Sequence, residues 1–123
     1  MDILKKTKEI LAEILDIDEE EIAPETYLIR DMNAESIDLL ELAVALNSAF
    51  NIKINDDEIF LRNLRPYLTE AKEKQADEVA YLLENFPFLT KDRMTQILDD
   101  LQGGPVLKVK DLAGYVAWRE ETS

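Results

Sequence analysis

The sequence predicts an all-α protein that forms one domain. Apolar residues recur at the spacing of a helix in five segments, residues 2–15, 36–49, 66–85, 91–101 and 109–119. A further short helix is expected to start at Asn55 or Asp56, because both residue types favour a helix start. Helix-ending residues separate the later segments, as at Pro87 and at Gly103-Gly104-Pro105. With 123 residues, of which 46% are apolar, the chain is long enough for one domain with a modest core.

The first helix is expected over residues 2–15 and is followed by a long loop over residues 16–35. Isoleucine and leucine form the apolar stripe of this helix, at positions 3, 4, 10, 11, 14 and 15. Four apolar residues are expected to anchor the loop on the core, namely Ile22, Tyr27, Leu28 and Ile29. The acidic run at residues 16–21 has the composition of a calcium loop, but it lacks the glycine at the sixth position, and Tyr27 stands where the bidentate glutamate belongs. We therefore interpret this run as a solvated turn.

Ser36 stands at the start of the second helix. The apolar stripe of that helix comprises Leu39, Leu42, Ala43, Leu46 and Phe50. Ser36 has a purely structural explanation as an N-cap, because its oxygen can accept a hydrogen bond from a backbone N–H of the first turn. Glu35 and Asp38 also have one, since negative charge is favourable at a helix N-terminus. Glu41 lies further along the helix and is explained less well in this way.

The composition excludes several classes of protein. Without histidine or cysteine the chain builds neither a Ser-His-Asp nor a Cys-His nucleophilic site, nor the usual zinc sites. The formal net charge of −13 argues against partners such as nucleic acid or anionic lipid and predicts partners with basic surfaces. Residues 1 to 62 hold 16 acidic and 6 basic side chains, so most of the charge surrounds Ser36. No segment has the length and composition of a membrane span or signal peptide, and we expect a cytoplasmic monomer with no metal site.

The segment around Ser36 resembles the attachment motif of the acyl carrier protein family. Where that family usually has Asp-Ser-Leu, this sequence has Glu35-Ser36-Ile37, and Asn33 replaces the usual glycine. These changes are conservative, because Glu keeps the charge, Ile keeps the apolar contact, and Asn tolerates a left-handed backbone conformation. The resemblance covers residues 4–60 and resumes near residue 109.

This resemblance implies an acyl-carrier-type four-helix bundle and a non-catalytic carrier. Ser36 would hold a 4′-phosphopantetheine arm, and a thioester on that arm would carry an acyl chain of a fatty-acid, lipid or polyketide pathway. The implied partners are a phosphopantetheinyl transferase and acyl synthases or acyltransferases with basic docking surfaces. In the family the second helix is the recognition surface, which implies partner binding by Glu35, Asp38, Glu41 and also Asp56. Asn47 and Ser48 stand where the family often has further acids, which indicates partners other than those of a housekeeping carrier.

Residues 64–105 have no counterpart in a minimal carrier. We expect them to form two additional helices, over residues 66–85 and 91–101, inserted between the third and last helices of the bundle. Three roles are open for this insertion: enlarging the core, extending an interior cleft for the acyl chain through residues such as Phe88, or docking a dedicated partner. The residues expected to line the acyl cleft are Leu42, Leu46, Phe50, Phe86, Met94 and Leu98.

A protein of a different class also fits this sequence. A helical interaction module could keep the scaffold of a carrier without being modified, and Ser36 would then act only as an N-cap. A hydrolase or a metal enzyme is the least favoured class, because histidine and cysteine are absent.

Overall fold

A computed structural model gives the structure of this protein and describes residues 2–122. These residues form seven α-helices and two short 3-10 helices, so the predicted all-α class is confirmed. The chain divides into two compact units, which we describe separately. The first unit contains the residues up to Ile54 and those from Leu107 onward, and the second contains Asn55–Val106.

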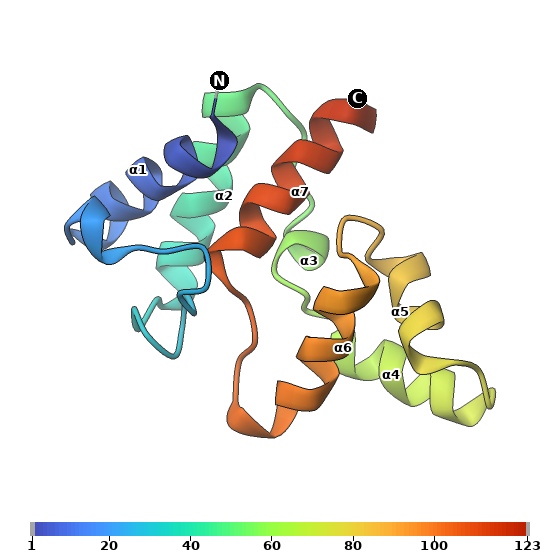
Figure 1. The fold of residues 1–123 in the computed structure, drawn as a ribbon. Coiled ribbons are helices and arrows are strands. Elements are labelled where there is room, and N and C mark those ends of the chain that lie inside the picture. Colours follow the sequence, from blue (N-terminus) through green and yellow to red (C-terminus); the bar gives the residue numbers. More distant parts are fainter. Residues whose placement is uncertain (1, 123) are drawn as a thin grey trace. The chain divides into compact units, whose positions relative to one another are not determined.

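The first unit is built from three α-helices (Figure 1). They are α1 (Ile3–Leu15), α2 (Ser36–Phe50) and α7 (Val109–Thr122), together with the 3-10 helix η1 (Glu19–Glu21). α1 packs against both α2 and α7. The fully buried side chains of this unit come from all three helices and from the loop before α2, and include Leu11, Ile22, Leu28, Leu42, Leu46, Leu112 and Tyr115. Burial of Ile22 and Leu28 confirms that they anchor the loop, whereas Tyr27 and Ile29 are half-buried.

The helix ends of the first unit follow from local capping. The Asp2 carboxylate accepts a hydrogen bond from the Lys5 N–H at 3.1 Å, which starts α1 one residue after the aspartate. Asp16 directly follows α1 and Asn51 directly follows α2, and both residues have the left-handed conformation that commonly ends a helix. α7 runs three residues beyond the predicted end at residue 119.

The second unit contains four α-helices. They are α3 (Asp56–Ile59), α4 (Leu64–Glu73), α5 (Glu78–Asn85) and α6 (Lys91–Asp100), followed by the 3-10 helix η2 (Leu101–Gly103). α4 packs on α5, and α5 packs on α6. The core of this unit includes Ile59, Phe60, Leu64, Ala71, Leu82, Phe86, Met94 and Ile97. The predicted short helix is confirmed as α3, because the Asn55 side chain accepts hydrogen bonds from the N–H groups of Asp57 and Glu58.

The single helix predicted over residues 66–85 is wrong. The chain forms two helices there, α4 and α5, with a break at residues 74–77. Gln75 has a positive φ of 55°, which an α-helix does not allow, and the Asp77 carboxylate caps α5 by accepting from the Ala80 N–H at 3.1 Å. Residues 64–105 therefore contain three α-helices rather than the two expected.

No helix among the described residues combines the length and the apolar character needed to cross a membrane.

Candidate functional site

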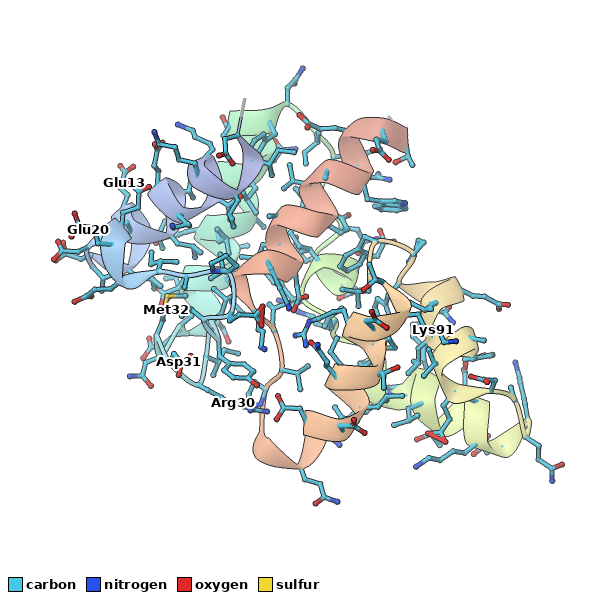
Figure 2. The ribbon with its side chains drawn as sticks, viewed as in Figure 1. Glu13, Glu20, Arg30, Asp31, Met32 and Lys91 are labelled. Atoms are coloured by element: carbon cyan, nitrogen blue, oxygen red, sulfur yellow. The ribbon has the colours of Figure 1, made fainter. Side chains whose placement is uncertain are left out.

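A short, hydrogen-bonded loop leads the chain into α2. The Asp31 carboxylate accepts from the Tyr27 N–H at 2.9 Å, and the Asn33 N–H donates to the Ile29 carbonyl at 3.0 Å. The Ala34 N–H then donates to the Leu28 carbonyl at 3.1 Å. Figure 2 shows Arg30, Asp31 and Met32 along this loop.

Asn33 has a left-handed backbone conformation, which agrees with its place where the family usually has glycine. Its φ is 55°, a region that asparagine enters more readily than most residues other than glycine. Asparagine in place of the usual glycine is therefore compatible with the left-handed turn that directly precedes α2.

Ser36 is the first residue of α2, and the residue before it is the N-cap. The Glu35 N–H donates to the Asp38 carboxylate at 2.8 Å, as in a capping box. The N-cap is therefore Glu35, one residue before the serine that was considered for this role. The N-cap role considered for Ser36 is therefore wrong. Its side chain is exposed, and within residues 2–122 no group forms a hydrogen bond with its hydroxyl.

An apolar stripe on the exposed side of α2 starts beside Ser36. Ile37, Leu40 and Val44 are 61%, 56% and 63% exposed. Their spacing of three and then four residues places them on one side of the helix. Sequence reasoning missed them, although they stand out as the apolar residues of α2 that do not belong to the Leu39, Leu42 and Leu46 stripe. We call Ile37, Leu40 and Val44 the exposed stripe.

Three carboxylates lie on or directly before the helix of the exposed stripe, because Asp38 and Glu41 belong to α2 and Glu35 is its N-cap. Glu35 and Glu41 are exposed and Asp38 is half-buried. In the part of the chain that the structure describes, no lysine or arginine pairs with any of the three. Among the described residues, no salt bridge therefore neutralises their negative charge. The fourth predicted partner residue, Asp56, belongs to the second unit, where it is the first residue of α3.

The six residues expected to line an acyl cleft are divided between the two units. Leu42, Leu46 and Phe50 are buried in the core of the first unit. In the second unit, Phe86 and Met94 are buried and Leu98 is half-buried. Phe86 packs edge-on against the ring of Phe88, with 6.4 Å between the two ring centroids. The cleft remains a prediction.

A hollow of about 610 Å³ in the first unit is lined by Lys8, Asp18, Glu19 and Glu20. Charged walls do not favour an apolar chain. Within residues 2–122 there is no group of three or more histidine, cysteine or acidic residues that could hold a metal ion. We assign no role to this hollow.

The loop before α2 is tied to the start of α7. The Leu28 N–H donates to the Leu107 carbonyl, the Val109 N–H to the Thr26 carbonyl, and the Lys110 N–H to the Pro24 carbonyl, each at 3.0 Å. Tyr27 and Lys108 form an isolated antiparallel bridge within this contact. Backbone bonds from residues 107–110 thus hold the loop that presents Ser36.

A salt bridge reinforces this contact between the loop and α7. The Glu25 carboxylate lies 2.6 Å from the Lys110 Nζ and 3.0 Å from the Lys108 Nζ. Hydrogen bonds from Lys110 and then Lys108 lower the pKa of Glu25 to about 2. The carboxylate therefore stays charged at any physiological pH.

Comparison with known proteins agrees with this geometry. Residues 5–65 match the phosphopantetheine attachment site family. The acyl carrier protein of Helicobacter hepaticus is 41% identical over 58 residues, which are 47% of this chain and 76% of that protein. The chain belongs to the acyl carrier protein family. The acyl carrier protein of Buchnera aphidicola is 45% identical over 56 residues, 46% of this chain and 72% of that protein. The acyl carrier protein of Thermosynechococcus vestitus is 42% identical over 57 residues, which are 46% of this chain and 70% of that protein.

As an acyl carrier protein, the chain is a non-catalytic carrier with a phosphopantetheine attachment site. The residues that match the family include most of α1 and all of α2 and α3, and they end at Arg65, within α4. The match therefore extends beyond the first unit and into the second, which begins at Asn55.

Proposed function

We propose that Ser36 is the residue that receives the phosphopantetheine arm, and that the protein carries acyl groups in a specialised fatty-acid, lipid or polyketide pathway. One observation supports the assignment most strongly. Ser36 is exposed at the first position of α2, and no described residue forms a hydrogen bond with its hydroxyl.

The surroundings of Ser36 suit a phosphate ester. The first N–H groups of a helix lack partners within the helix, and together with the helix dipole they favour a negatively charged group. The Asp38 carboxylate accepts the Glu35 N–H at 2.8 Å and so helps to fix the first turn of α2. When bound, the arm supplies a thiol that holds an acyl group as a thioester.

Attachment of the arm needs a second protein, because this chain has no histidine or cysteine to activate a hydroxyl. The Ser36 Oγ forms a new bond to the phosphorus next to the pantetheine half of coenzyme A. The bond from that phosphorus to the bridging pyrophosphate oxygen breaks, adenosine 3′,5′-bisphosphate leaves, and the serine proton passes to a base of the transferase. This chain contributes the nucleophile and the surface on which the transferase docks.

The exposed stripe and the three carboxylates form the docking surface that we assign to α2. A partner with an apolar groove would bury Ile37, Leu40 and Val44, which are more than half exposed. Basic residues beside that groove would pair with Glu35, Asp38 and Glu41, and long-range attraction would speed the encounter. The sequence has no basic residue between Arg30 and Lys53 to oppose this attraction.

The acyl chain itself would be sheltered by apolar side chains. Leu42, Leu46 and Phe50 are the candidates in the first unit, since they line the interior side of the helix that bears Ser36. Phe86, Met94 and Leu98 are the candidates in the second unit, and their part in binding would mark a long or unusual chain. Asp56 completes the proposed partner residues.

Intact mass spectrometry tests the assignment of Ser36. The full chain is incubated with coenzyme A, Mg²⁺ and a promiscuous phosphopantetheinyl transferase, beside the variants Ser36→Ala and Ser48→Ala. Ser48 is the matched control, because it is an exposed serine on the same helix. We expect one phosphopantetheinyl addition on the wild type and on Ser48→Ala, and none on Ser36→Ala.

Two results would contradict the proposal. An addition that persists in Ser36→Ala would place the arm on another residue. No addition on any of the three proteins, even with the transferase of the source organism, would instead support an unmodified interaction module.

A further inference from the structure

The Tyr27 ring contacts two positive charges, which come from distant segments of the first unit. The Arg30 guanidinium, in the loop before α2, lies 4.3 Å from the centroid of this ring. The Lys108 Nζ, in the residue before α7, lies 5.0 Å from the same centroid. A cation within about 6 Å of an aromatic centroid is attracted electrostatically by the ring. Tyr27 and Lys108 are therefore joined through their side chains as well as through their backbone bridge.

Lys108 is held in place by its own neighbours in the first unit. Its N–H donates to the Asp111 carboxylate at 2.9 Å, its carbonyl accepts from the Asp111 N–H at 3.0 Å, and Asp111 is only 2% exposed. The Lys108 Nζ lies 3.0 Å from the Glu25 carboxylate, and its side chain is 14% exposed. A cation that is largely removed from water needs partners that favour its charge, and a carboxylate and an aromatic ring both do so. These contacts keep the charge beside the Tyr27 ring.

Tyr27 begins the hydrogen-bonded turn that leads to Ser36. Its N–H donates to the Asp31 carboxylate at 2.9 Å, and its carbonyl accepts from the Asp31 N–H at 3.2 Å. The carbonyl of the next residue, Leu28, accepts from the Ala34 N–H at 3.1 Å, and both of these residues are buried. Ser36 follows Ala34 by two residues. A displacement of Tyr27 would therefore reach the start of α2 through this turn.

We propose that Lys108 is a positioning residue for Ser36. By holding the Tyr27 ring with its charge, Lys108 orders the turn over residues 27–34 and thereby fixes how the start of α2 presents the serine. Lys110 binds the same Glu25 carboxylate, at 2.6 Å, but within residues 2–122 its charge does not lie over the Tyr27 ring. The effect at Ser36 rests on the proposed function, whereas the order of the turn is independent of it.

Amide hydrogen exchange of the full chain, followed residue by residue by NMR, tests the order of the turn. Lys108→Gln removes the positive charge and keeps an N–H donor for Glu25. We expect exchange of the Leu28 and Ala34 amides to become about threefold faster, as for the loss of one cation–π contact. Lys108→Arg keeps the charge and should restore the wild-type rates. Unchanged exchange in Lys108→Gln would overturn the proposal. Lys108→Leu, which also lacks the charge, carries the same prediction if Lys108→Gln does not fold.

Lys110→Gln is the matched control. It removes a charge from the same Glu25 carboxylate, and from the shorter of the two ion pairs. We expect exchange of the Leu28 and Ala34 amides to stay as in the wild type, because the charge over the Tyr27 ring is kept. Equal acceleration in Lys110→Gln and Lys108→Gln would assign the effect to the salt bridge and overturn the proposal.

A double substitution tests whether Lys108 acts through the Tyr27 ring. Tyr27→Leu removes the ring, so Lys108→Gln should cause no further acceleration when it is added to Tyr27→Leu, since residues in contact have effects that do not add. Independent effects of the two substitutions would overturn the proposal. Tyr81→Leu is the control for loss of a half-buried tyrosine, because the Tyr81 ring lies 5.1 Å from the Lys74 Nζ in the second unit. It should leave the Leu28 and Ala34 amides unchanged.

Transferase kinetics connect the turn to Ser36. Lys108→Gln leaves the proposed docking surface on α2 unchanged, so we expect an unchanged KM and a kcat lowered about threefold, because the reacting hydroxyl is oriented less well. Lys108→Arg should restore kcat. A raised KM with an unchanged kcat would show a role in docking and overturn the positioning role. If no protein is modified at Ser36, the proposed function fails, whereas amide exchange still decides whether Lys108 orders the turn.

Discussion

The two units of this carrier treat their large apolar side chains differently. Among residues 2–122, the large apolar side chains that are exposed all lie on α2 of the first unit. The second unit has helices of similar character, yet its large apolar residues are buried or half-buried, as Leu82 and Leu98 illustrate. The first unit therefore has an exposed apolar surface on α2, which agrees with the docking surface that we propose there. The second unit uses its apolar residues for its own core.

The helices of the two units also differ in their charges. α2 and its N-cap residue Glu35 together have three carboxylates and no basic residue, whereas α4 and α6 each combine acidic and basic side chains. Mixed charges largely cancel at a distance, while charges of one sign add to a field that steers a partner. Together with the apolar stripe, this places the proposed docking surface on α2.

The largest expected effect tests whether the units are independent. Leu46→Ala and Leu82→Ala each truncate a fully buried leucine, one in each unit. Each should lower the free energy of unfolding of its own unit by about 2 to 5 kcal/mol, because it removes apolar contacts and leaves a cavity. Amide exchange should accelerate only in the unit that has the substitution. Acceleration of both units by either variant would show that they unfold together.

The next prediction concerns the exposed stripe. Leu40→Glu should lower kcat/KM for modification by the transferase at least about tenfold, since a charge replaces a side chain that a partner would bury. The melting temperature should change little, because Leu40 is 56% exposed. Ala80→Glu, at an exposed position of α5, is the matched control and should leave kcat/KM unchanged. Equal losses in both variants would remove the distinction between the units.

A smaller effect is expected at the charges. Glu41→Gln should slow association with the transferase about two- to fivefold at low salt, and the difference should vanish in 1 M salt because ions screen exposed charges. Stopped-flow measurements of the association rate would test this. Glu73→Gln makes the same change at an exposed position of α4 and should have no such effect. If the two variants behave alike, net charge rather than the α2 surface controls association.

The smallest effect concerns the salt bridge between the loop and α7. The pKa of Glu25 is lowered from its ordinary value of 4.5 to about 2, so its contribution to stability is present above pH 4.5 and is lost as the pH falls toward 2. Glu25→Gln should cost less than about 1 kcal/mol at pH 7, because the Glu25 side chain is 60% exposed. Urea denaturation at several pH values would measure the difference. A difference that persists unchanged at pH 2 would rule out a charge effect.

Sequence patterns predicted the segments whose local signals agree with one another. The apolar stripe of residues 3–15 indicated α1, and the structure has that helix, with Asp2 as its cap. At α4 and α5 the signals conflicted, because Leu68 and Ala71 on one side and Val79 and Leu82 on the other share helical spacing. Because the prediction relied on this periodicity alone, it continued one helix through the polar residues between the two pairs. The left-handed Gln75 that ends α4 has no strong signal in the sequence.

At the site around Ser36, too, some properties follow from the sequence and others only from the tertiary structure. The sequence itself determined that the chain is helical, strongly acidic and without histidine or cysteine, and that Ser36 begins a helix preceded by an asparagine suited to a left-handed turn. These properties depend on composition and on neighbours along the chain. The tertiary structure alone decided which apolar residues of α2 face solvent, because α2 is apolar on several sides and packing buries only some of them. It also decided that residues 107–110 hold the loop before Ser36, since that contact joins segments about 80 residues apart.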